Sequence, residues 1–276
     1  MKELMNKEDA KVLLLFLLGR FEEVCEKANI PYYASGGTLL GAVRHGGFIP
    51  WDDDIDVMIE RKYYSLFVRT CKEVLEEPVV FESRENDPDF CQEYIKLCFK
   101  EDDGGFSALS LDVFFLDNTD RKQVVLRAAQ NLTLQTLYSV KKMKLSNGAY
   151  TPKNPLKKAA VSFLSKKLSF GDIELLHKKT MLKEERDTGL LVNWGSCYSY
   201  KKATYRKIDL GTPQRLPFEN TTVSAAEHPE AILKKLYGED YMTLPPEEKR
   251  TDHGVEQLHC SALDFDEIKR KVGLEK

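Results

Sequence analysis

Residues 35–57 read SGGTLLGAVRHGGFIPWDDDIDV, and the interpretation of the whole chain starts from this stretch. Two adjacent glycines stand where a short apolar segment leads into a helix-like segment, so backbone N–H groups at that turn are placed to hold an anion. Four aspartates then fall within positions 52–56. Because glycine turns bind phosphates and carboxylates bind divalent cations, the stretch predicts chemistry at a phosphorus atom.

The aspartates are placed to share a metal ion. Along a strand, side chains alternate between faces, so Asp54 and Asp56 project to one side while Ile55 and Val57 enter the core. Two carboxylates this close repel each other unless a cation lies between them. A third acid, Asp112, stands inside the apolar run LDVFF, where a buried charge without a partner is costly. The predicted catalytic residues, and ligands of Mg²⁺ or Mn²⁺, are Asp54, Asp56 and Asp112; the alternative is a helix cap and a surface turn.

Residues at both ends of the expected helix 38–44 are candidates for phosphate or nucleotide binding. They are Ser35, Gly36, Gly37, Thr38, Arg44 and His45. The first four offer hydroxyl and backbone N–H groups at the start of the helix, and the last two offer positive charge at its end. For Arg44 and His45 the alternative is a solvated surface or pairing with the aspartates. Lys96 is a further, weaker candidate, because most lysines are solvated.

The composition excludes several classes of protein. The chain has 276 residues, 42% hydrophobic and 31% charged, which is enough for a sizeable core. Its six cysteines are scattered without a Cys-x-x-Cys pair, which argues against a zinc site or a disulfide framework and predicts reduced thiols in the cytoplasm. The apolar run 12–18 is too short to span a bilayer, and its spacing predicts a core-facing helix over 7–28.

Short strands and helices alternate along the chain, which predicts an α+β fold. Strands are expected at 32–34, 55–59, 79–82, 93–99, 109–116 and 204–208, a hairpin around 218–223, and helices at 62–75 and 229–237. Helices dominate the segment between 120 and 188. We therefore divide the chain into a catalytic core, 1–119, a basic helical segment, 120–188, and a C-terminal part, 189–276, that completes the catalytic domain.

The helical segment is strongly basic. Between positions 121 and 170 the chain has eleven basic residues and no Asp or Glu, which leaves 30 basic against 44 acidic residues elsewhere. The eleven are Arg121, Lys122, Arg127, Lys141, Lys142, Lys144, Lys153, Lys157, Lys158, Lys166 and Lys167. Over 156–168, apolar residues alternate with lysines at helical spacing, as in helices that lie on an anionic membrane or polymer. The expected membrane contact spans 141–168; the alternative is a solvated helical face.

The stretch from Tyr33 to Asp56 resembles the LicD family of phosphocholine transferases, which is related to fukutin and fukutin-related protein. A second block, with LPFEN at 216–220, LYGEDYMTLPPEEKR at 236–250 and His253, resembles the same family. Between these C-terminal segments, Ala225 to His228 departs from the family pattern, which usually contains a proline there. The resemblance implies a nucleotidyltransferase fold of the polymerase-β type, with a mixed sheet flanked by helices and a mostly helical basic insertion.

The resemblance also implies an activity and a set of partners. Such proteins transfer the phospho-alcohol of CDP-choline, or of another CDP-alcohol, to a glycan, a teichoic acid precursor or lipopolysaccharide, and release CMP. The acceptor can be lipid-linked, which places the protein in the cytoplasm or at the inner face of the cytoplasmic membrane; no nucleic-acid partner is expected. By the same resemblance, Asp54 and Asp56 hold the metal, Asp112 matches the third carboxylate, and residues 36–38 cradle the donor diphosphate.

Choline, if it is the transferred alcohol, needs aromatic rings around its quaternary ammonium group. Trp51, Trp194 and Tyr198 are the candidate cage residues, although large aromatics more often belong to a core. Two other functions stay open. One is a nucleotidyltransferase that attacks the α-phosphate of a nucleoside triphosphate, and the other is a non-catalytic module that binds a membrane surface.

Overall fold

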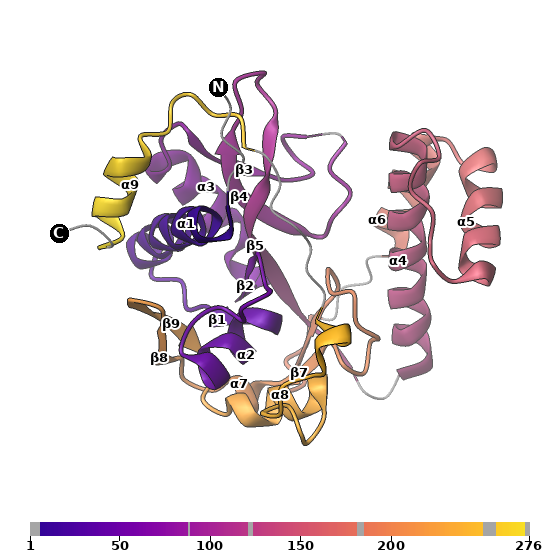
Figure 1. The fold of residues 1–276 in the computed structure, drawn as a ribbon. Helices are drawn as coiled ribbons and strands as arrows, with labels where there is room; N and C mark the ends of the chain where they lie inside the picture. Colours follow the sequence, from indigo (N-terminus) through magenta and orange to yellow (C-terminus); the bar gives the residue numbers. More distant parts are fainter. Residues whose placement is uncertain (1–5, 88, 121–123, 181–184, 251–257, 274–276) are drawn as a thin grey trace. The chain divides into compact units, whose positions relative to one another are not determined.

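The computed structural model describes residues 6–87, 89–120, 124–180, 185–250 and 258–273. Along the chain (Figure 1) the elements are α1 (Lys7–Ala28), β1 (Tyr33–Ala34), α2 (Gly36–His45), β2 (Ile55–Glu60), η1 (Arg61–Tyr63), α3 (Tyr64–Val74), β3 (Val79–Glu82), β4 (Tyr94–Lys100), β5 (Phe106–Asn118), α4 (Val124–Leu145), α5 (Pro155–Lys167), α6 (Phe170–Thr180), β6 (Leu190–Asn193), β7 (Thr204–Arg206), α7 (Lys207–Leu210), β8 (Gln214–Phe218), β9 (Thr221–Ala225), α8 (Pro229–Tyr237), η3 (Glu247–Lys249) and α9 (Phe265–Lys271).

The chain folds into two compact units. Unit 1 comprises Met1–Ser83, Tyr94–Phe115 and Lys207–Lys276, and unit 2 comprises Arg84–Glu93 and Leu116–Arg206. The strands of the main sheet run in the order β1-β2-β5-β4-β3, with β6 and β7 added beyond β5. Strand β5 belongs to both units, because its residues 106–114 pair with β4 and its last residues, 116–118, pair with β6. The predicted α+β class is confirmed.

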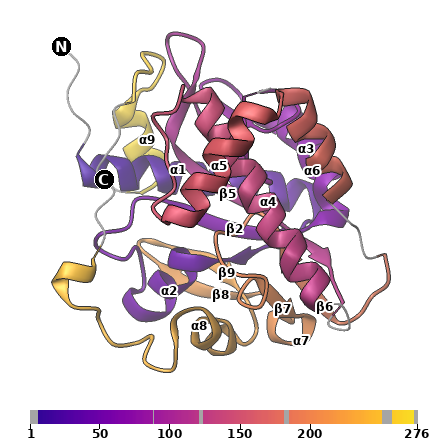
Figure 2. The ribbon, with the colours of Figure 1, turned by 90° about the vertical axis from the view of Figure 1, so that its right-hand side faces the viewer.

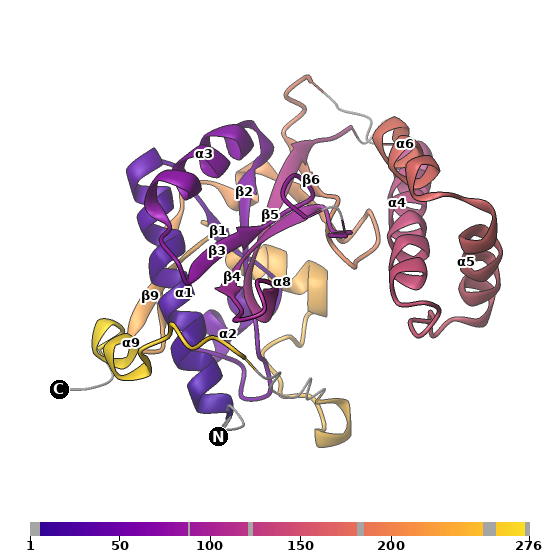
Figure 3. The ribbon, with the colours of Figure 1, turned by 90° about the horizontal axis from the view of Figure 1, so that it is seen from above.

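Helix α1 forms over the predicted residues and anchors the core of unit 1. The side chain of Asn6 caps its first turn by accepting a hydrogen bond from the Asp9 N–H (2.9 Å), and Asn29 ends it in the left-handed conformation (φ 50°). Its buried residues include Leu14, Leu17 and Phe21, which are shielded from solvent almost completely. Helices α3 and α9 both contact α1 (Figures 1 and 3), so α1 is covered along its length by unit 1.

Two elements from the C-terminal part of unit 1 pack against α2. Helix α8 and strand β8 both contact α2, as Figure 2 shows. The turn between β8 and β9 holds the loop after α2: the Glu219 N–H donates to Gly46 O (2.7 Å), and the Glu219 carboxylate accepts the Phe48 N–H (2.8 Å). This loop leads directly to the aspartates. Glu219, which is 171 positions after Phe48, therefore helps to fix the position of the aspartates.

One predicted element is wrong in part. The strand expected over 204–208 ends at Arg206, and residues 207–210 form the short helix α7. Residue type alone did not distinguish strand from helix here, because Tyr205 and Ile208 are both apolar. In the structure, Tyr205 is buried in the sheet, whereas Ile208 is 70% exposed. The strand therefore ends where its pairing with β6 ends.

Unit 2 contains the three helices of the basic segment and the hairpin-like pair β6–β7. Helix α4 contacts α5 and α6, which lie beside it in Figure 3. The side chains buried among these helices are Leu137, Val140, Met143, Val161 and Ile173. Arg121 and Lys122, which belong to the predicted basic segment, lie outside the described residues. Among the described helices, none combines the length and the apolar character needed to cross a membrane.

Candidate active site

The glycine turn brings the start of α2 against β2. Strand β1 pairs with β2 so that Ala34 lies opposite Val57, and the Ser35 N–H donates to Asp56 O (2.9 Å). The Asp56 N–H in turn donates to the hydroxyl of Thr38 (2.8 Å). These bonds fix the first turn of α2 beside the carboxylate-bearing end of β2. The predicted residues at 35–38 and Asp56 are therefore neighbours.

The two glycines leave room for two carboxylates. A Cβ on Gly37 would stand 2.2 Å from the Asp52 Oδ2, and one on Gly36, whose φ is +50°, would stand 2.8 Å from the Asp56 Oδ2. Both distances are shorter than van der Waals contact, so any larger residue would displace these side chains. Because the positive end of the helix dipole lies here, the first turn of α2 also favours negative charge.

The acids form one cluster. Asp52, Asp53 and Asp54 each offer a carboxylate oxygen, and these oxygens all lie within 4.8 Å of one another. Burial raises the pKa of Asp56 well above its ordinary value, and the charges of Asp54, Asp112 and Asp52 raise it further. The structure therefore brings Asp112, from β5, close to Asp56 on the neighbouring strand β2. Asp52, which we did not predict as a ligand, joins the predicted acids.

Asp112 is oriented by its own sheet. The hydroxyl of Ser110 donates to Asp112 Oδ1 (2.8 Å), and Lys96 lies opposite Asp112 in the β4–β5 register. Burial raises the pKa of Asp112, while Lys96 and hydrogen bonds from Ser110 and Tyr94 act in the opposite direction. Sequence reasoning missed Ser110 and Tyr94. The position of Ser110, two residues before Asp112 on the same strand face, was the available signal.

The predicted phosphate contacts at 44 and 45 lie at the other end of α2. Ten residues of helix span about 15 Å, which separates them from the glycine turn. Arg44 donates from Nη1 to Tyr241 O (2.9 Å) and from Nε to His45 Nε2 (3.0 Å). Burial lowers the pKa of both side chains, and the charge of Arg44 lowers that of His45 further. Their contact with a phosphate stays a prediction.

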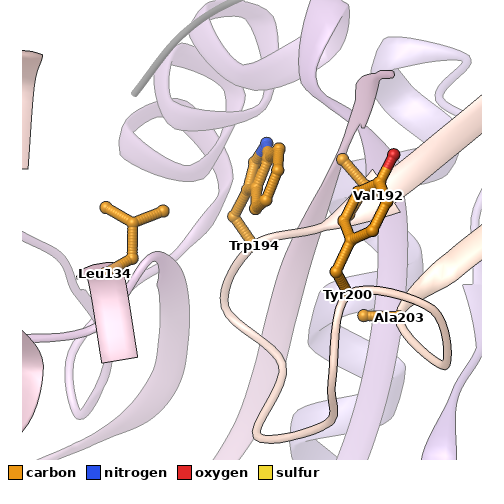
Figure 4. Close-up of a cluster of buried hydrophobic side chains, with 5 residues drawn as sticks. All are labelled: Leu134, Val192, Trp194, Tyr200 and Ala203. Carbon is orange, nitrogen blue, oxygen red and sulfur yellow. The ribbon is translucent and has the colours of Figure 1, made fainter. Parts of the chain in front are cut away.

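The three candidate cage aromatics have different surroundings. In unit 1, the guanidinium of Arg250 lies 4.9 Å from the ring centroid of Trp51, so this ring already faces a cation. In unit 2, Trp194 is only 3% exposed and packs among Leu134, Val192, Tyr200 and Ala203, with its ring stacked on that of Tyr200 (Figure 4). Trp194 is therefore a core residue, while Tyr198 is partly buried against the same cluster.

Comparison with known proteins identifies the part of the chain that carries this cluster. The family model described as LicD/FKTN/FKRP, nucleotidyltransferase domain, matches residues 29–127. Residues 29–127 of this chain therefore form a LicD-family domain. The match includes the glycine turn, the aspartates and Asp112, so the resemblance seen in the sequence is confirmed.

Two kinds of relative are similar to this chain. The lipopolysaccharide cholinephosphotransferase LicD of Haemophilus influenzae is 28% identical over 276 residues, which cover 94% of this chain and 99% of that protein. The ribitol 5-phosphate transferase FKRP of Homo sapiens, like that of Mus musculus, is 56% identical over 36 residues, which cover 13% of this chain and 7% of FKRP. The likeness to the Haemophilus protein is therefore spread over the chain, whereas that to FKRP is short and dense.

Proposed function

We propose that this protein is a metal-dependent phosphotransferase that moves a phospho-alcohol, first of all phosphocholine, from a CDP-alcohol to a hydroxyl of a cell-surface glycan or teichoic acid precursor. The other product is CMP. The observation that carries the proposal is the packing of Asp52 and Asp56 against Gly37 and Gly36 at the start of α2, with Asp112 beside them. The names of the relatives, one a cholinephosphotransferase and one a ribitol 5-phosphate transferase, support the class of transferred group.

The acids fit a divalent cation. Every donor in the cluster is a carboxylate oxygen, the ligand that Mg²⁺ and Mn²⁺ prefer. The mutual repulsion that raises the pKa of Asp56 is relieved when a cation lies among the carboxylates. Asp54, Asp56 and Asp112 would hold the metal, and the bound metal supplies positive charge that neutralises the donor diphosphate.

The chain's own residues account for binding and proton transfer. The N–H groups of the first turn of α2 bind the donor diphosphate, with the hydroxyls of Ser35 and Thr38 beside them. The acceptor hydroxyl oxygen attacks the phosphorus that bears the alcohol, and the bond from that phosphorus to the bridging oxygen breaks, so CMP leaves with the electron pair. Asp112, held by Ser110 and Tyr94, accepts the proton of the acceptor hydroxyl.

Choline recognition is assigned to Trp51. Its ring lies one residue before the aspartates and faces Arg250, which a choline headgroup could replace as the cation on the ring. Replacement of Trp51 by Leu should raise the KM for CDP-choline more than that for CDP-glycerol, because glycerol carries no charge. An equal change for both donors would remove Trp51 from the cage.

The decisive experiment uses the whole protein. Purified protein is incubated with Mg²⁺, an acceptor glycan and CDP-choline, CDP-ethanolamine, CDP-glycerol or CDP-ribitol in turn, and CMP is measured. CMP release that requires both the metal and the acceptor supports the proposal. Release of pyrophosphate from a nucleoside triphosphate, with no reaction of any CDP-alcohol, would favour nucleotidyl transfer. No turnover of either donor class, in a protein shown to be folded, would favour the non-catalytic alternative.

A further inference from the structure

Helix α5 of unit 2 has an apolar face that the described residues leave exposed. Val161 is its buried residue and packs in the core shared with α4. On the opposite side, Leu156 is 83% exposed and Phe163 is 62% exposed. Because these two are seven positions apart, they lie on one face, two turns from each other. Ala159 and Ala160 are exposed between them, so the outward face carries a continuous apolar stripe.

Lysines border this stripe. Lys158, Lys166 and Lys167 are exposed on α5, and the helix contains no acidic residue. At 100° per residue, Lys166 falls beside Ala159 at one edge of the stripe, and Lys167 lies in line with the stripe, one turn beyond Phe163. Lys158 lies farther round the helix, away from the centre of the stripe. Long lysine side chains in this position lay their methylene groups on an apolar surface and keep the ammonium group in water.

The structure also shows that some lysines of the basic segment are engaged inside the protein. Lys141 is buried and donates to Phe90 O (3.1 Å) and Glu174 (3.0 Å), and Lys144 donates to Ser165 O (3.0 Å). These lysines hold the helices of unit 2 together. Lys141 and Lys144 are therefore engaged inside unit 2, whereas Lys158, Lys166 and Lys167 of α5 are exposed.

We propose that the outer face of α5 docks on a bilayer that contains anionic lipids, with Leu156 and Phe163 inserted at the level of the acyl chains and the lysines at the headgroups. Two observations favour a bilayer over a soluble anionic polymer. A polymer of phosphates and sugars offers charge to the lysines but no hydrocarbon to the two exposed apolar side chains. An interfacial helix needs both, a basic border and an apolar stripe on one exposed face.

The test is vesicle binding, measured by co-sedimentation with phosphatidylcholine vesicles with and without phosphatidylglycerol. We expect binding to the anionic vesicles only. The variant Lys158→Gln/Lys166→Gln/Lys167→Gln should bind at least tenfold more weakly, since a lysine near an anionic surface contributes about fivefold in affinity. A matched control, Lys72→Gln/Lys201→Gln/Lys234→Gln, removes the same charge from exposed lysines elsewhere and should bind like the wild type.

A second variant separates the two kinds of partner. The variant Leu156→Ser/Phe163→Ser keeps every charge but removes the two apolar side chains. It should therefore bind anionic vesicles more weakly than the wild type does, whereas its binding to a soluble polyanion such as polyglycerol phosphate should not change. If this variant binds anionic vesicles as well as the wild type does, the bilayer proposal is overturned in favour of a polymer. The proposal is also overturned if the wild-type protein does not bind anionic vesicles. Because all five replaced side chains are exposed, circular dichroism should show a native fold, and binding needs no turnover, so failure of this test leaves the proposed reaction untouched.

Discussion

The two units each contain a cluster of charged side chains, and the clusters are built on opposite principles. In unit 1, Asp52, Asp54, Asp56 and Asp112 carry the same sign, and their repulsion adds to burial in raising the pKa of Asp56. In unit 2, the cluster consists of side chains of opposite charge that contact one another. Arg84 contacts both Glu93 (2.9 Å) and Glu174, and Glu174 also accepts a hydrogen bond from Lys141.

The difference shows in Glu174. Burial acts to raise its pKa, but the hydrogen bond from Lys141 and the charge of Arg84 outweigh burial and hold the pKa below its ordinary value. The balanced cluster is therefore complete within the protein and stabilises it. At Asp56, burial and the neighbouring carboxylates act in the same direction, so its ionised form costs stability unless a cation binds beside it, which is expected of a site that works on a ligand.

The largest expected effect separates activity from stability. Asp56→Asn should lower the rate of CMP release about a thousandfold, because several kcal/mol of charge stabilisation depend on the metal that Asp56 would hold. The same change removes a repelling charge, so the melting temperature without metal should stay equal or rise. Asp103→Asn, on an exposed turn, is the control and should change neither quantity. An Asp56→Asn protein that is fully active, or one that melts well below the wild type, would contradict the assignment of the acids in unit 1 to a metal site.

A smaller effect is expected from the glycine turn. In Gly37→Ala the new Cβ would meet the Asp52 Oδ2 at 2.2 Å, so the carboxylate must move. A displacement of about 1 Å costs about a hundredfold in rate. Gly19→Ala is the matched control, because a Cβ there meets nothing within 4 Å; it should leave the rate unchanged and stabilise α1 by at most about 1 kcal/mol. Equal rates for the two variants would remove the glycine turn from the site.

Lys96 tests whether the cation opposite Asp112 in the β4–β5 register belongs to the reaction. Lys96→Gln should lower kcat/KM about tenfold, since it removes a positive charge from the face on which Asp112 lies. Lys100→Gln, on the same strand and paired with Glu77, should keep the wild-type value. If both variants behave alike, Lys96 is only a solvated lysine.

The smallest effect concerns the balanced cluster. Glu174→Gln should destabilise unit 2 by about 1 kcal/mol, a value kept low because the Glu174 side chain is 46% exposed. Hydrogen exchange in α4 and α6 measures it, and Glu185→Gln is the exposed control. Because the folded pKa of Glu174 is lowered, its stabilisation is complete above the ordinary pKa of a glutamate and is lost as the pH falls through the folded value. After division by the intrinsic exchange rates, which themselves fall with pH, we expect lower protection on acidification in the wild type but not in Glu174→Gln. Identical pH dependence in both would show that the cluster is not a stabilising one.

Much of the local structure was readable from the sequence. The helix from Lys7 to Ala28 and the strand from Val79 to Glu82 have the predicted bounds, because apolar spacing and turn residues act over a few positions. The helix Pro229–Tyr237 was predicted for the same reason, with Pro229 at its start and Gly238 after its end. Asp112 was found as a candidate because burying a charge within an apolar run costs free energy unless the charge has a partner.

The surroundings of those acids could not be read in the same way. The contribution of Tyr94 and Lys96 to the site depends on the register of β4 against β5, and that of Glu219 on a hairpin far along the chain. Trp194 stood in a turn-like sequence and lies in a core. Lys141 stood in a basic run and is paired with Glu174. In each case the deciding contact is made by a residue that lies far away along the chain, at a separation that no sequence pattern fixes.

By itself, the sequence determined which side chains are candidates for the chemistry and which segments are helices or strands, since these follow from residue type and short-range periodicity. Only the tertiary structure decided that Asp112, 56 positions after Asp56, comes to lie beside it, that two glycines make room for two carboxylates, and which lysines point outward on α5. The physical reason is that strand pairing and side-chain packing join residues whose distance along the chain is arbitrary, and charge acts through the distance in space.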